Sequence, residues 1–247
     1  MPLKQITAMC LAALLALPAA AQREPDRVFM MPDLAGGLRW GVGLGNASAW
    51  LADGRVTIEA RTADSTVCRI ASPLAGGGSI IISERRLADT DGSVFKVTAE
   101  RMPEGTALYW AYGGASAQTD IDSGHDPLTP ECCADNVFSV EGSAFTLYYG
   151  TSRRLRIVSA IAPQGSDIRL SDARCRQTPA AMFASGKRTD APALCARLPL
   201  VAGQPVYFVV YRQTARADYA VWMLPELHRT GSFVVHSQGG WMKSTPD

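Results

Sequence analysis

Apolar and polar residues alternate along most of this chain. Phe95, Val97 and Ala99 alternate with Lys96, Thr98 and Glu100. Successive side chains of a β-strand point to opposite faces of its sheet, so a period of two predicts a strand with one buried face. Residues 206–211 alternate two apolar sets, which predicts a strand buried on both faces. The same pattern predicts strands over residues 39–44, 55–61, 66–71, 79–85, 107–112, 137–141, 144–149 and 154–160.

Turn sequences such as Asp53-Gly54 and Asp91-Gly92 separate these segments. Many short strands, roughly 8–12 residues apart, predict a mainly β protein, an antiparallel β-sandwich of the supersandwich kind. One short helical excursion interrupts the pattern between residues 171 and 190, where Ser171 or Asp172 could cap a turn and Pro179 could start a second. Residues 217–229 fit helical spacing, but Pro225 would kink or end a helix there.

The N-terminus predicts a secretory signal peptide over residues 1–21. Lys4 precedes an apolar run over residues 6–17, too short to span a bilayer, and Ala19-Ala20-Ala21 supplies a cleavage site. We therefore expect an exported protein, periplasmic or extracellular, in which residues 22–247 form a single β-sandwich domain. The alternative is a retained N-terminal anchor.

The net charge of the chain excludes some classes of binding partner. The chain has 24 basic and 23 acidic residues, and removal of Lys4 with the signal peptide makes it neutral. A neutral chain with no basic block argues against nucleic acid and against an anionic membrane as partner.

Five cysteines follow the signal peptide: Cys68, Cys132, Cys133, Cys175 and Cys195. Export permits disulfides, but an odd number leaves at least one thiol outside them. Cys175 and Cys195 bracket the helical excursion, so the sequence favours a disulfide between them. No metal site is predicted, because there is no C-x-x-C and no histidine at ligand spacing from a cysteine.

Residues 108–136 hold the candidate chemistry. Asp120, Asp122, Asp126 and Glu131 cluster there, and a pair of carboxylates could hydrolyse a glycosidic bond. Acids in such a Gly/Ser-containing loop are also typical solvated turn residues. A calcium site formed by Asp120, Asp122 and Asp126 is a further alternative, although the spacing is not that of an EF-hand. No other cofactor is predicted.

Residues 108–136 could also bind a carbohydrate. Trp110 and Tyr112 share one face of their strand and could stack on a sugar ring, with Asp122 and His125 hydrogen bonding to its hydroxyls. The competing interpretation is that both aromatics belong to the sandwich core. Nucleophilic catalysis has little support, since there is no G-x-S-x-G elbow and His125 lies in a loop.

Several blocks in order resemble an uncharacterised bacterial family. They are residues 110–116 (WAYGGAS), 130–136 (PECCADN), 144–150 (AFTLYYG), 198–200 (LPL), 203–207 (GQPVY) and 244–247 (STPD). The family is a domain of unknown function at the N-terminus of large secreted proteins that continue into a six-hairpin, (α/α)6 glycosidase-like module. The resemblance covers residues 32–247 and implies a β-sandwich without that module, whose catalytic carboxylates lie in the helical part.

We therefore expect an exported, non-catalytic module associated with polysaccharide processing, similar to the N-terminal accessory domain of a glycoside hydrolase. Its partners would be a carbohydrate and a helical glycosidase-like module, in the same chain or encoded nearby. Two alternatives remain open. The acids of residues 120–131 could make the chain itself a glycoside hydrolase, or the chain could be a truncated gene product without function.

Overall fold

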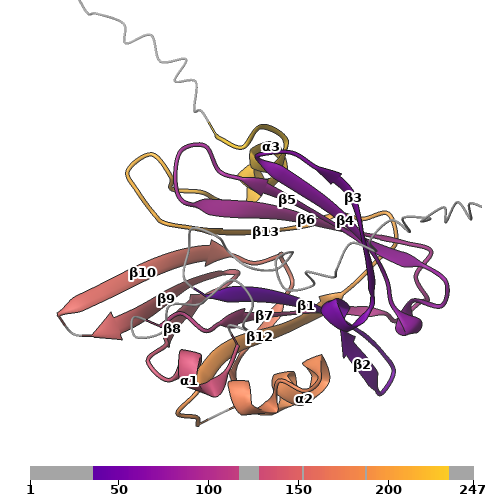
Figure 1. Ribbon diagram of the computed structural model, residues 1–247, viewed down its shortest axis with the longest axis horizontal. Helices are drawn as coiled ribbons and strands as arrows, with labels where there is room; N and C mark the ends of the chain where they lie inside the picture. Colours follow the sequence, from indigo (N-terminus) through magenta and orange to yellow (C-terminus); the bar gives the residue numbers. More distant parts are fainter. Residues whose placement is uncertain (1–35, 117–127, 152, 187, 234–247) are drawn as a thin grey trace, which may run out of the picture.

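The computed structural model describes residues 36–116, 128–151, 153–186 and 188–233. Two antiparallel sheets pack face to face, as the sequence predicts (Figure 1). The smaller has five strands in the order β11-β12-β7-β1-β2, and the larger has eight in the order β3-β4-β5-β6-β13-β10-β9-β8. The fold is thus mainly β, an antiparallel sandwich.

The smaller sheet consists of β1 (Gly37–Leu44), β2 (Ala47–Trp50), β7 (Ala107–Gly113), β11 (Asp167–Asp172) and β12 (Pro192–Pro199). The larger consists of β3 (Arg55–Arg61), β4 (Ser65–Ala71), β5 (Ser79–Arg86), β6 (Gly92–Glu100), β8 (Val137–Glu141), β9 (Ala144–Thr151), β10 (Arg154–Ile161) and β13 (Val206–Tyr211). Two short 3-10 helices lie in connections, η2 (Leu51–Asp53) and η3 (Pro73–Ala75).

All the predicted strands are present with small shifts at their ends, but β2, β11 and β12 were not predicted. β2 has only four residues, too few to show a period of two. β11 is an edge strand in which Ile168 and Leu170 do alternate with polar residues, a signal that sequence reasoning missed. β12 lies between two strands and is buried on both faces, so its apolar residues do not alternate with polar ones.

A single aromatic core fills the space between the sheets. Trp40 and Trp110 of the smaller sheet meet Phe208 of the larger, with ring centroids 5.7 and 5.0 Å away respectively. Phe95 lies beside Trp40, its ring centroid 6.3 Å away. The alternation along β6 is confirmed, since Phe95, Val97 and Ala99 all lie in this core.

The helical excursion covers the outer face of the smaller sheet. It contains η4 (Ala173–Cys175) and α2 (Pro179–Ala184), and α1 (Pro130–Cys133) lies on the same face (Figure 1). The Asp172 carboxylate accepts a 2.9 Å hydrogen bond from the Arg174 amide, and the Thr178 hydroxyl accepts one from the Ala181 amide. The predicted cap at Asp172 and the start at Pro179 are therefore confirmed.

The outer face of the larger sheet is covered only in part. The segment with η5 (Val221–Met223) and α3 (Leu224–Thr230) packs Leu224 and Leu227 on β6 and β13. Pro225 lies in the first turn of α3, where no intrahelical N–H is needed, so it starts this helix instead of ending one. No helix among the described residues is long and apolar enough to cross a bilayer.

Candidate functional site

The predicted aromatic sugar platform is not exposed. Trp110 and Tyr112 both have 0 % of their surface exposed. The Trp110 ring stacks on Phe145 at a centroid distance of 5.7 Å, and its indole N–H donates to the Ser166 hydroxyl at 3.2 Å. Burial also raises the pKa of Tyr112. As placed in this structure, neither ring can stack on a sugar, because both fill the space between the sheets.

The predicted carboxylate cluster is only partly described. Asp120, Asp122, His125 and Asp126 lie outside the described residues, so their hydrolytic, sugar-binding and calcium-binding roles stay predictions. Glu131 is exposed in the first turn of α1. Among the residues that the structure describes, no three His, Cys, Asp or Glu side chains gather as metal ligands.

The predicted disulfide between Cys175 and Cys195 is absent, and both residues are thiols. Cys195 lies in β12 with its side chain in the buried cluster under α2, where its Sγ is 3.8 Å from the Pro179 carbonyl oxygen. Burial raises the pKa of this thiol. Cys175 is only partly buried, at the end of η4. The fact that two cysteines bracket an excursion is therefore not sufficient to predict a disulfide between them.

The block at residues 130–136 has a structural role. Asn136 is buried, and its Oδ1 accepts hydrogen bonds from the Gly114 and Ala115 amides at 3.0 and 3.3 Å. Its Nδ2 donates to the Ala115 carbonyl at 2.5 Å. The Asn136 side chain thus connects the two described segments on either side of residues 117–127. These hydrogen bonds give Gly114, Ala115 and Asn136, which lie in the sequence blocks 110–116 and 130–136, a shared structural role.

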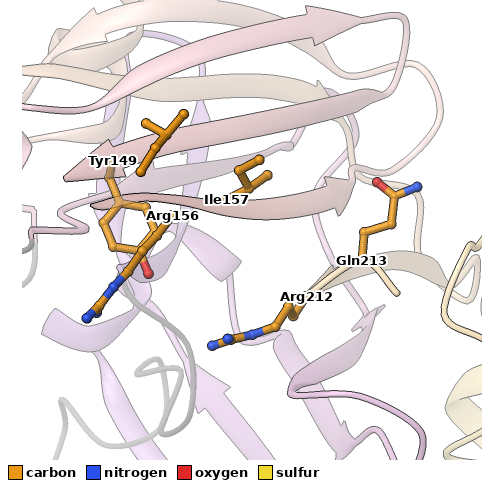
Figure 2. A pocket seen from close by; sticks show the side chains of 6 residues that line it. Tyr149, Arg156, Ile157, Arg212 and Gln213 are labelled. Carbon is orange, nitrogen blue, oxygen red and sulfur yellow. The ribbon is translucent and has the colours of Figure 1, made fainter. Parts of the chain in front are cut away.

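A different site lies where β10 and β13 separate. The two strands pair only from Ser159 to Ile161, opposite Tyr211 to Val209. β10 begins at Arg154, five residues earlier, and β13 ends at Tyr211, so residues 154–158 have no partner on the β13 side among the described pairings. This separation opens a groove of about 790 Å³ (Figure 2). Its size is within the range of about 300–1,000 Å³ found for small-ligand sites.

Six residues line this groove: Tyr149, Leu155, Arg156, Ile157, Arg212 and Gln213. The alternation along β10 separates them by face. Arg156 is on the same face as the core residues Val158 and Ala160, whereas Leu155 and Ile157 face outward and are 57 % and 48 % exposed. Figure 2 shows the Arg212 side chain extended toward Arg156 and Tyr149.

The groove carries positive charge. The Arg212 Nε lies 3.3 Å from the Asp91 carboxylate, so one of the two guanidinium groups has an acidic partner. Arg156 is exposed, and no carboxylate of the described residues forms an ion pair with it. Gln213 is held by two contacts: its Oε1 accepts from the Ser159 hydroxyl at 3.3 Å, and its Nε2 donates to Asp218 at 3.2 Å.

Sequence reasoning missed this groove, although the chain carries one signal for it. Arg156 occupies a core-side position in an otherwise regular strand, and a charge on that face predicts that the core ends there. Arg212 could not be paired with it, because the register of β10 against β13 is not readable from the sequence.

Ser83 and His228 form a second polar contact. The His228 Nε2 lies 3.0 Å from the Ser83 hydroxyl and 3.1 Å from the Ser83 carbonyl oxygen. Burial lowers the pKa of His228, so the ring is favoured in its neutral form. No carboxylate of the described residues contacts this ring, so the pair lacks the third member of a catalytic triad. It joins α3 to β5.

The fold and the groove define a two-sheet β-sandwich domain with an open basic groove between β10 and the end of β13 in the larger sheet. The chain belongs to the family described as a domain of unknown function, DUF4450, whose model matches residues 31–229. This confirms the resemblance to an uncharacterised domain family.

Two further comparisons concern curated proteins and solved structures. The sequence matches no curated protein. Among solved structures it is similar to a bacterial glucoamylase in complex with acarbose, with 13 % identity and a TM-score of 0.47. The match covers 80 % of this chain and 30 % of that one, so the chain spans less than a third of the glucoamylase.

Proposed function

We propose that this protein is an exported, non-catalytic β-sandwich module that binds a saccharide during polysaccharide processing. The observation that carries the proposal is the open groove between β10 and the end of β13. The resemblance of the sequence blocks to domains that precede glycosidase-like modules supports the choice of a saccharide as ligand.

The lining of the groove suits a sugar. Leu155 and Ile157 offer exposed aliphatic surface, which can cover the apolar face of a pyranose ring. Arg156, Arg212 and Gln213 supply N–H donors, and an amide adds an acceptor, so hydroxyl groups would find partners of both kinds. A mixture of apolar surface and few polar groups is typical of small-ligand sites.

The non-catalytic role is supported by the placement of the acids. Glycosidases need two carboxyl groups about 5–10 Å apart across the scissile bond. None of the six groove residues carries a carboxyl group, and Glu131 lies on α1 at the other sheet. In this proposal the bond-breaking residues belong to a helical module in the same chain or encoded nearby, and this domain holds the polysaccharide.

The test is binding of the purified chain to a panel of soluble polysaccharides by affinity electrophoresis, followed by titration calorimetry. The double variant Leu155→Thr/Ile157→Thr removes aliphatic surface from the groove while keeping strand-forming residues. We expect roughly five-fold or greater weakening, since about two aliphatic contacts are lost.

The matched control is Ile58→Thr/Val201→Thr, which removes two comparably exposed aliphatic side chains elsewhere. It should bind as the wild type does. A wild-type chain that binds no polysaccharide would contradict the proposal, as would equal binding by both double variants. Release of reducing sugar by the purified chain, lost in Asp122→Asn or Glu131→Gln, would contradict the non-catalytic role.

A further inference from the structure

We propose that the groove recognises an anionic saccharide, through a carboxylate or sulfate on the sugar placed between Arg156 and Arg212. This inference rests on the proposed saccharide-binding function and names the class of sugar.

Arg156 gives the first reason. It occupies a position on the core-side face of β10, two residues before the buried Val158, yet it is exposed and has no acidic partner among the described residues. A guanidinium group presents up to five N–H donors in a planar fork that matches a carboxylate or sulfate in bidentate geometry. The exposed Arg156 guanidinium group is therefore available to bind an anion in the groove.

Arg212 gives the second reason. It reaches the groove from the other side of the strand separation and extends toward Arg156 (Figure 2). Two like charges that face one another raise the free energy of the empty groove, and an anion between them relieves that repulsion. Asp91 pairs with Arg212 through Nε and is itself half exposed, so one excess positive charge remains in the groove.

The surroundings point to a sugar carrying the anion and not to a bare ion. Leu155 and Ile157 line the same groove, and a free carboxylate or sulfate would gain nothing from them. Gln213 is held in place by Ser159 and Asp218, so its amide is fixed before a ligand arrives. Because Arg156 and the two aliphatic side chains lie on opposite faces of β10, an acidic saccharide that crosses the unpaired edge of this strand would contact the charged and the aliphatic surface together.

The test compares three ligands of equal length with the full chain by titration calorimetry. They are an oligogalacturonate, the same oligosaccharide with its carboxyl groups methyl-esterified, and a sulfated oligosaccharide. We expect roughly 10-fold or tighter binding of at least one anionic ligand than of the ester, because a charge-assisted hydrogen bond adds about that factor. The two anionic arms distinguish carboxylate from sulfate.

The variants Arg156→Gln and Arg212→Gln should each remove most of this preference, and raising the salt concentration should weaken binding of the anionic ligand only. The control Arg55→Gln removes an exposed arginine from β3, an edge strand separated from β13 by β4, β5 and β6, and should retain the preference. Since all three arginines lie at the surface, the variants should fold, which their thermal melts verify.

The outcomes separate the two proposals. Equal binding of the oligogalacturonate, its ester and the sulfated ligand would overturn the anionic preference and leave saccharide binding intact. An anionic preference that survives in both groove variants would overturn the assignment to Arg156 and Arg212. Absence of binding to any of the ligands, and to the wider polysaccharide panel, would overturn the saccharide proposal itself.

Discussion

Replacing Trp110 by alanine tests the central packing of the sandwich. The residue has no exposed surface, and it contacts Phe145 and Phe208 of the opposite sheet with ring centroids 5.7 and 5.0 Å away. Its indole N–H also donates to Ser166 at 3.2 Å. The substitution removes all of these contacts at one point between the sheets.

The expected cost follows from these contacts. Truncation of a buried Phe or Trp to Ala costs about 3–5 kcal/mol of unfolding free energy. Two aromatic pairs, worth about 0.5–1.5 kcal/mol each, and a hydrogen bond of about 1 kcal/mol place Trp110 at the upper end of that range. For a chain of this size, each kcal/mol lowers the melting temperature by about 2–4 °C, so we expect a fall of roughly 10–15 °C.

Urea unfolding followed by circular dichroism measures the free energy directly. Trp222→Ala is the matched control, because Trp222 is 68 % exposed and its ring contacts Phe233 edge-on at a centroid distance of 5.3 Å. It should cost no more than about 0.5–1 kcal/mol. If Trp110→Ala were as stable as Trp222→Ala, the placement of Trp110 in the core would be wrong, and its earlier interpretation as a sugar platform would regain its basis.

Three further predictions concern other buried groups. Burial raises the pKa of Glu84 above its ordinary 4.5, so the folded chain holds this proton more tightly than the unfolded chain does. The stability that this group contributes therefore falls as pH rises above about 4.5, and Glu84→Gln should reduce this fall in the unfolding free energy measured with urea. An unfolding free energy that depends on pH in the same way in both proteins would show that Glu84 is not buried. Asn136→Ala should lower the unfolding free energy by about 1–3 kcal/mol, because the Gly114 and Ala115 amides lose their acceptor. A decrease below about 0.5 kcal/mol would contradict the structural role of these hydrogen bonds. Iodoacetamide in native conditions should modify Cys175 faster than the buried Cys195, and a peptide map containing a disulfide between them would contradict the structure.

The sequence predicted most of the sandwich because alternation reports burial on one face. β6 and β9 each place alternate residues in the core, and the pattern of apolar side chains is then visible directly. β12 was not predicted because both of its faces are covered, so its apolar residues do not alternate with polar ones. β11 does alternate over residues 167–171, and that signal was missed. The failure at β12 follows from its neighbours in the sheet, which its own residues do not determine.

The candidate site was less predictable. Trp110 and Tyr112 were rightly placed on one face of a strand, but only the packing of the two sheets decides that this face is closed. Arg156 and Arg212 are 56 positions apart and line one groove because the first residues of β10 extend past the end of β13. That difference in strand length depends on the pairing register, a long-range property of the fold.

The most direct test of the central claim is an NMR titration of the labelled chain with an oligogalacturonate and with its sulfated counterpart. One of them should cause amide shift changes concentrated at Tyr149, residues 155–157 and residues 212–213, and Arg156→Gln should abolish these changes. Shift changes centred elsewhere, or none with any acidic or neutral oligosaccharide, would contradict this claim.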